Sequence, residues 1–191
     1  MRLRKKSMPK GKQLEAYLRE VHRHYKLQRR AYMQKAPDPV NITGRRGSKV
    51  WGVISKSYFP DFFGYVIHKP YPIFVGGEAK ECSHERRFSL SRIEQSQAET
   101  LGQIHKDGGI AWVWIRNLRG DDGFVDYLLP WIHISKWIQE GHKSATWNDM
   151  IPWRVPPGLG WIDAAVQRQD VTWSTFCELG WEILNQRTSR S

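Results

Sequence analysis

The most constraining feature of the chain is an uninterrupted apolar run, Ile110-Ala111-Trp112-Val113-Trp114-Ile115. Successive side chains of a strand point to opposite faces of a sheet, so a strand of this composition must be covered on both faces. A turn at residues 120–123 and a second apolar run at residues 124–129 follow, and they predict a neighbouring strand. The chain is therefore expected to place a sheet between two covering layers.

Two other stretches show the helical spacing that such layers require. The first has four apolar residues three or four positions apart: Leu14, Leu18, Val21 and Tyr25. The second would bury Ile93, Ala98, Leu101 and Ile104. Ser91 and Glu94 have the spacing of a capping box, which predicts Ser91 as the N-cap of this helix. With strand candidates at residues 62–67 and 73–80, the pattern predicts an α/β fold with a central mixed sheet flanked by helices.

Residues 38–57 interrupt this pattern. Short apolar segments there flank a glycine-rich basic turn, Thr43-Gly44-Arg45-Arg46-Gly47-Ser48-Lys49. We interpret the segment as a protruding hairpin with a basic tip.

The charge balance narrows the range of partners. The chain has 30 Lys and Arg against 19 Asp and Glu, a net charge of +11, which favours a polyanion and above all nucleic acid. A membrane is disfavoured because neither end carries an amphipathic helix rich in lysine and tryptophan, and no apolar run is long enough to span a bilayer. Cys82 and Cys177 are expected to be free thiols in a reducing cytosol. A basic protein without a nucleic-acid partner is the remaining alternative.

A carboxylate pair carries the chemistry. Pro60-Asp61 is followed seventeen residues later by Glu78-Ala79-Lys80. On a strand Glu78 and Lys80 project from one face with Ala79 behind them, and a hairpin brings Asp61 beside Glu78. The alternative is that Asp61 caps a turn while Glu78 and Lys80 form a solvated ion pair. The surrounding aromatic residues argue against it, because charges are costly in an apolar setting.

Two convergent carboxylates suit a hard cation such as Mg²⁺, which takes oxygen ligands and keeps several waters. Such an ion lowers the pKa of a bound water and stabilises charge on a phosphoryl oxygen. Lys80 would orient the water or neutralise the transition state. This set of groups is suited to hydrolysis of a phosphodiester.

Asp61 with Glu78-Ala79-Lys80 resembles the core motif of the PD-(D/E)xK nuclease superfamily. The following sequence resembles the RecU type of Holliday-junction resolvase over roughly residues 10–163. Four motifs occur in the family's order: Glu78-Ala79-Lys80-Glu81, Arg86-Arg87-Phe88-Ser89-Leu90, Gln97-Ala98-Glu99 and Gly108-Gly109-Ile110. The resemblance implies a restriction-endonuclease-like core and an endonuclease that resolves four-way DNA junctions by symmetric, metal-dependent cuts.

The resemblance also implies site residues. Glu15, in Gly11-Lys12-Gln13-Leu14-Glu15, would join Asp61, Glu78 and Ala79 at a Mg²⁺ or Mn²⁺ ion; its alternative is an i+4 pair with Arg19. Gln97 would position the water or the DNA strand, and its alternative is a partly buried helix residue. Asp61, Glu78, Lys80, Glu15 and Gln97 are thus the expected catalytic set.

Residues 38–57 lie where the family inserts a stalk that enters the junction. Phosphate contacts are expected from six basic residues: Arg45, Arg46, Lys49, Lys56, Arg86 and Arg87. We expect a nuclease domain over residues 1–163 and a tryptophan-containing extension over residues 164–191. Two symmetric cuts require a homodimer with one site per subunit. A cytoplasmic location in a bacterium or a phage-infected cell is expected.

Two other functions stay open. One is a different endonuclease on the same core, of the repair or restriction type, and the other is a non-catalytic architectural protein that binds junctions. Nine of the ten tryptophans lie from Trp112 onward. They either stack on unpaired bases or, as we expect, build the core and a dimer interface. Gly141-His142-Lys143-Ser144 lacks the upstream glycine of a P-loop, so nucleotide hydrolysis is rejected.

Overall fold

The computed structural model describes residues 12–38, 40–54, 59–67, 71–120 and 123–167. Its centre is a six-stranded sheet in the order β1-β4-β5-β7-β8-β10. Strands β5 and β7 are parallel, and the other neighbours are antiparallel. The strands are β1 (Ala31–Lys35), β4 (Phe62–Val66), β5 (Ile73–Cys82), β7 (Ile110–Gly120), β8 (Gly123–Pro130) and β10 (Arg154–Val155). The predicted α/β fold with a central mixed sheet is confirmed.

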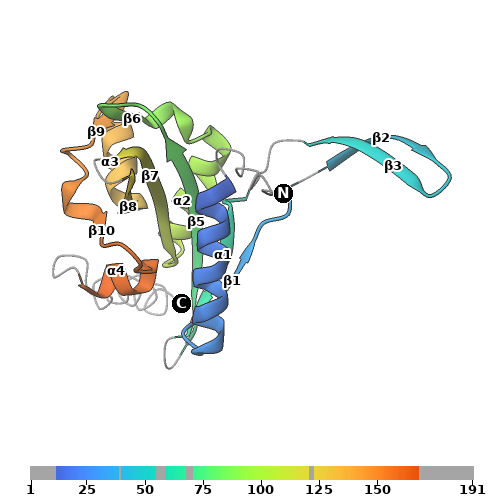
Figure 1. Cartoon of the computed structure of the whole chain (residues 1–191), viewed down its shortest axis with the longest axis horizontal. Coiled ribbons are helices and arrows are strands. Elements are labelled where there is room, and N and C mark those ends of the chain that lie inside the picture. Colours follow the sequence, from blue (N-terminus) through green and yellow to red (C-terminus); the bar gives the residue numbers. More distant parts are fainter. Residues whose placement is uncertain (1–11, 39, 55–58, 68–70, 121–122, 168–191) are drawn as a thin grey trace, which may run out of the picture.

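Helices cover both faces of this sheet (Figure 1). They are α1 (Lys12–Leu27), α2 (Gln95–Lys106), α3 (Trp131–Gln139) and α4 (Trp161–Gln167). Residues of α1 and α4 join one apolar cluster, and residues of α2 and α3 join the other. Strand β7 serves both clusters, with Trp112 and Trp114 in the first and Val113 and Ile115 in the second. This alternation confirms the prediction of a central strand that is covered on both faces.

The start of α2 differs from the prediction. Ser91 is not the N-cap, because it lies in a separate 3-10 helix, Leu90–Arg92. Ile93 then takes an extended conformation (φ −89°, ψ 110°) and is only 6% exposed. An extended residue cannot continue a helix. The buried Ile93 therefore separates the 3-10 helix from α2. The N-cap is Glu94, whose backbone N–H donates to Gln97 Oε1 at 3.0 Å.

The segment between β1 and β4 forms a two-stranded antiparallel hairpin of β2 (Val40–Arg46) and β3 (Lys49–Ile54). It projects away from the layered part of the molecule (Figure 1). At its turn, Gly47 has φ +60°, a conformation that glycine adopts without strain. Its large apolar side chains are exposed: Val40, Ile42, Val50, Trp51 and Val53.

Smaller elements complete the fold. Strands β6 (Arg87–Ser89) and β9 (Ser144–Thr146) pair in a third sheet, and a second 3-10 helix spans Ile151–Trp153. Four tryptophans are buried, as a core role predicts: Trp112, Trp114, Trp131 and Trp161. Cys82 is a buried free thiol, as predicted, and Cys177 lies outside the described residues. None of the described helices has the length and hydropathy needed to cross a membrane.

Candidate functional site

The site begins where β4 stops pairing with β5. The last paired residues are Phe62 and Gly77, and β5 continues to Cys82 with only β7 beside it. Asp61 immediately precedes β4, and its Oδ2 accepts the backbone N–H of Ala79 at 2.9 Å. The Asp61 N–H in turn donates to Glu78 Oε2 at 3.2 Å. The Asp61 carboxylate thus takes the place of a strand partner at this edge and meets Glu78, as the hairpin argument predicted.

Glu78 is the most enclosed of these groups, with a side chain only 1% exposed. Its Oε1 accepts hydrogen bonds from Lys80 Nζ at 2.6 Å and from Gln97 Nε2 at 2.7 Å. Lys80 Nζ also donates to Gln97 Oε1 at 3.1 Å, which closes a triangle of three side chains. The alternative of a solvated ion pair is therefore wrong. Gln97 reaches the site because α2 lies against the face of β5 that carries Glu78.

Two glycines precede Glu78 and let other parts of the core approach β5. A Cβ atom at Gly77 would lie 2.1 Å from the Trp112 ring, and one at Gly76 would lie 2.3 Å from Ile104 Cδ1. Both distances are far below van der Waals contact. Gly77 is thus required by packing against the Trp112 ring, whereas a side chain at Gly76 would require Ile104 to move. Together they seat the Glu78 strand between Trp112 on one face and α2 on the other.

With both carboxyls ionised, the site carries one negative charge more than the single ammonium neutralises. Burial raises the pKa of Glu78 to about 8, and the charge of Asp61 contributes to the rise. Burial likewise raises the pKa of Asp61, and Lys80 lowers the pKa of both carboxyls. Desolvation and a like charge both disfavour an ionised carboxylate, so one ammonium does not compensate for the pair. This arrangement favours an additional cation.

Glu15 stands beside this cluster rather than within it. Its carboxylate pairs with Lys35 of β1 at 3.1 Å and with Arg19 at 3.5 Å, so the i+4 pair named as the alternative is present. Glu15 also contributes, as a smaller cause, to the raised pKa of Asp61. No hydrogen bond joins Glu15 to Asp61 or Glu78 among the described residues. Its role as a metal ligand stays a prediction.

Within the described ranges, no group of three or more His, Cys, Asp or Glu side chains is arranged to hold a metal ion. The site instead offers two carboxylates. Mg²⁺ is commonly bound through one or two carboxylates while it keeps several waters, so this donor set suits it.

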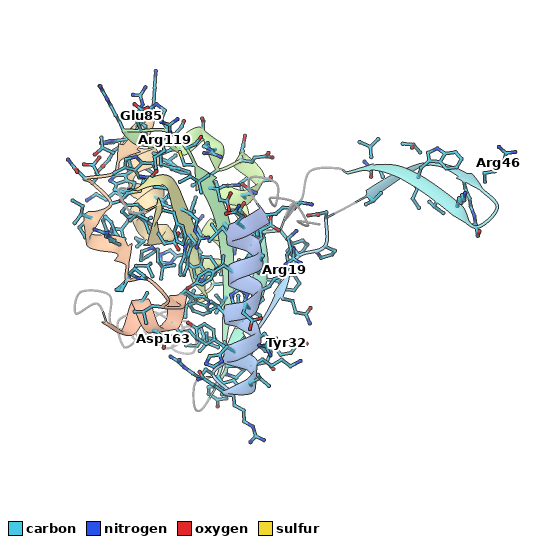
Figure 2. All side chains as sticks on the ribbon, viewed as in Figure 1. Arg19, Tyr32, Arg46, Glu85, Arg119 and Asp163 are labelled. Atoms are coloured by element: carbon cyan, nitrogen blue, oxygen red, sulfur yellow. The ribbon has the colours of Figure 1, made fainter. Side chains whose placement is uncertain are left out.

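The basic residues predicted to contact DNA fall in two places. Arg45, Arg46 and Lys49 lie around the turn of the hairpin, and Figure 2 shows Arg46 at its far end. Arg86 and Arg87 follow β5 and are exposed. Lys56 lies outside the described residues. The described basic residues thus form two separate groups, one on the hairpin and one just after β5.

A family model described as "Recombination protein U" (RecU) matches residues 9–152, which include the carboxylate cluster, the hairpin and every strand of the central sheet except β10. The chain belongs to the RecU family. It is 28% identical to the Holliday junction resolvase RecU of Staphylococcus carnosus in an alignment that covers 81% of this chain and 79% of that protein. The RecU proteins of Shouchella clausii and Bacillus thuringiensis are 29% and 28% identical, over 61% and 74% of this chain. These matches span 57% and 72% of those two proteins.

Within this RecU-family chain, three interactions were not predicted, two beside the site and one on the other face of the sheet. Lys35 pairs with Glu15, and Glu81 Oε1 accepts the N–H of Leu14 at 2.7 Å at the start of α1. Arg116 and Asp126 form a buried ion pair. Only the Arg116–Asp126 pair could have been suspected from the sequence, because Arg116 and Asp126 each place a charge in a largely apolar strand. Lys35 could not, because β1 is short and its pattern did not indicate a strand.

Proposed function

We propose that this chain is a structure-selective endonuclease that resolves four-way DNA junctions by hydrolysing phosphodiester bonds. The observation that carries the proposal is the buried pair of Asp61 and Glu78 with Lys80 at the open edge of β5. This cluster lies inside the region matched by the RecU family, and similar proteins in that family are named Holliday junction resolvases.

The residues fit a divalent cation, Mg²⁺ or Mn²⁺. Asp61 and Glu78 supply hard oxygen ligands, and their raised pKa values mark a pair that such a charge would stabilise. The Ala79 carbonyl points to the same side of β5 as its N–H, which meets Asp61, so it faces this edge as well. Glu15 would assist from α1. When bound, the ion supplies an activated water and stabilises charge on the phosphoryl oxygen.

The side chains around the carboxylates have separate tasks. The Lys80 ammonium lies on the catalytic face and neutralises charge that develops on the phosphate in the transition state. Gln97 donates to Glu78 and accepts from Lys80, so it fixes both groups. The Ala79 N–H holds Asp61 at the end of β4. Each of these orientations is set before substrate binds, which lowers the cost of reaching the reactive geometry.

The remaining parts of the molecule fit a junction substrate. We infer a restriction-endonuclease-like core within residues 1–163, with the β2–β3 hairpin as a basic stalk at about residues 38–57 and an extension at residues 164–191. The stalk presents Arg45, Arg46 and Lys49 together with exposed apolar side chains. The cations contact phosphates, and the apolar groups lie against the unpaired centre of a junction. A homodimer acting in the cytoplasm supplies two sites for the symmetric cuts.

The test is a cleavage assay with the full chain. A labelled four-way junction and a linear duplex of matched sequence are each incubated with Mg²⁺, Mn²⁺ or a chelator. Paired symmetric nicks in the junction alone, abolished by the chelator, are the expected result. Equal cutting of the linear duplex would identify a general endonuclease instead, and tight junction binding without cleavage under any metal would identify an architectural protein.

A further inference from the structure

A basic hollow lies next to the carboxylate cluster, at the end of β5. It has a volume of about 610 Å³, and its cationic lining residues are Arg87, Arg92 and Lys143. Ser89 and Ser144 add hydroxyl groups, and none of its described lining residues carries a carboxylate. Within the part of the chain that the structure describes, none of the three cations is in an ion pair. Three uncompensated positive charges around one hollow favour an anionic ligand.

The hollow continues the catalytic face. Cys82 lines it and follows Lys80 by two positions on β5, so the two side chains project from the same face. Two residues of a strand span about 7 Å. The Cys82 wall of the hollow is therefore close enough to Lys80 for one DNA strand to contact both. That distance makes the hollow a neighbouring subsite for the same strand of DNA.

The structure holds the three cations in place. The β6–β9 pair aligns Arg87 with Thr146 and Ser89 with Ser144. The Leu90 N–H donates to the Lys143 carbonyl at 3.0 Å, and this bond joins the two sides of the hollow. Phe88, fully buried between Arg87 and Ser89, anchors β6 in the core. The cations thus project from a fixed backbone rather than from a free loop.

An adjoining hollow is a weaker candidate. It has a volume of about 730 Å³ and is lined by Arg86, Arg87 and Arg119, but Glu85 lines it as well. Glu85 pairs with Arg119 at 2.9 Å, so part of its charge is compensated (Figure 2). The uncompensated charge is greatest around Arg87, Arg92 and Lys143.

We propose that Arg87, Arg92 and Lys143 form a phosphate subsite that binds the DNA backbone one or two nucleotides from the bond cleaved at Asp61 and Glu78. The inference rests on the proposed nuclease function and extends it to Arg92 and Lys143, which carry no assigned role. The subsite fixes the register of the strand over the carboxylates and reads no base sequence.

The experiment uses the full chain with Arg92→Gln and Lys143→Gln combined. Junction binding is measured in chelator over a range of salt concentrations, and cleavage is measured with Mg²⁺. A double variant with Lys26→Gln and Lys106→Gln is the matched control, because it removes two exposed charges from the far ends of α1 and α2. Each lost phosphate contact lowers the slope of log affinity against log salt by about 0.9.

We expect the subsite variant to lose between about one and two units of that slope and to bind the junction roughly tenfold more weakly. Its cleavage at subsaturating junction should fall by a similar factor, because less junction is bound. The control should keep the wild-type slope. If the subsite and control variants show the same salt dependence while the wild-type protein cuts junctions, the subsite proposal is wrong and the proposed nuclease function stands. Wild-type protein that neither binds nor cuts junctions would instead refute the proposed function.

Discussion

The sheet carries two buried clusters of charge, one on each face. On the α2 face, Glu78 meets Asp61 and the single ammonium of Lys80. On the α1 face, Arg116 and Asp126 lie opposite each other on β7 and β8 and form two hydrogen bonds of 2.7 Å. The Arg116 guanidinium also lies 4.0 Å from the Phe124 ring centre.

The clusters differ in how their charges balance. The Arg116–Asp126 pair is one cation against one anion in bidentate geometry, which is the arrangement that best satisfies a buried ion pair. The Glu78 cluster holds two carboxylates against one ammonium, and burial, with the charge of Asp61 as a second cause, raises the pKa of Glu78 to about 8. A balanced buried pair leaves neither charge without a partner, whereas an excess of one sign marks a candidate place for a ligand of the opposite sign.

The largest expected effect comes from removing one charge of the unbalanced cluster. Asp61→Asn keeps an oxygen for the Ala79 N–H, so the local backbone should be preserved. We expect metal-dependent junction cleavage to fall by at least about a thousandfold, or ~4 kcal/mol in the transition state. The free energy of unfolding without metal should not fall, because the variant relieves the repulsion of Glu78. Cleavage rates and urea unfolding measure the two effects.

Full metal-dependent cleavage by the Asp61→Asn variant would remove Asp61 from the catalytic set. Loss of folding in the variant would mean that the charge is structural, and the contrast between the clusters would then be wrong. Asp38→Asn is a suitable control because its carboxylate is 64% exposed and pairs only with Lys35 in the described structure.

The balanced cluster should respond in the opposite way. Arg116→Met leaves Asp126 as a buried charge without its partner, and we expect it to destabilise the fold by about 3–5 kcal/mol. Adding Asp126→Leu should restore most of that loss. Cleavage per folded molecule should stay near the wild-type rate in the double variant. Urea unfolding checks the stability, and a cleavage defect as large as that of Asp61→Asn would show that this pair belongs to the chemistry.

The pH dependence of stability separates the clusters further. A carboxyl group whose pKa is higher in the folded protein stabilises the fold fully below its unfolded pKa, and this contribution is lost as the pH rises through the folded pKa. For Glu78 these limits are 4.5 and about 8. Metal-free protein should therefore lose on the order of 2–4 kcal/mol of stability between about pH 5 and pH 9.

Chemical denaturation at a series of pH values without metal measures this loss. Glu78→Gln should flatten the profile, whereas the Arg116→Met and Asp126→Leu double variant should keep it. The proposed binding of Mg²⁺ to the ionised carboxylates should restore stability at the alkaline end. A wild-type profile that is flat without metal would contradict the buried, unbalanced pair.

The sequence predicted the parts of this comparison that depend on local pattern. The alternation in residues 110–115 predicted the two-sided core, and Glu78 with Lys80 on one strand face predicted their contact. The encounter of Asp61 with Glu78 required only the assumption of a hairpin.

What the sequence did not predict depends on long-range packing. Strand β1 is recognisable only through its pairing with β4, and Lys35 reaches Glu15 only because α1 lies beside it. The start of α2 was misplaced because a capping-box spacing at Ser91 competes with the burial of Ile93, and burial prevailed. The small β6–β9 sheet that holds the basic hollow joins residues more than fifty positions apart.

The smallest expected effect concerns the residue that joins α2 to the unbalanced cluster. Gln97 contacts Glu78 and Lys80, whereas Gln95 is exposed and bonds only to Glu99 in the described structure. We expect Gln97→Ala to lower the cleavage rate at saturating junction by about 10- to 100-fold, as for other groups that orient metal ligands. Junction affinity in chelator should change little, and Gln95→Ala should leave both quantities unchanged.

Because Gln97 also caps α2 through the Glu94 N–H, thermal unfolding of both variants is needed beside the kinetics. Gln97→Glu keeps the acceptor for Lys80 and for the Glu94 N–H but places a third carboxylate against Glu78, so it should cleave more slowly than Gln97→Ala if the balance of charge governs the site. Equal rates for these two Gln97 variants would show that Gln97 acts on the helix and not on the carboxylates.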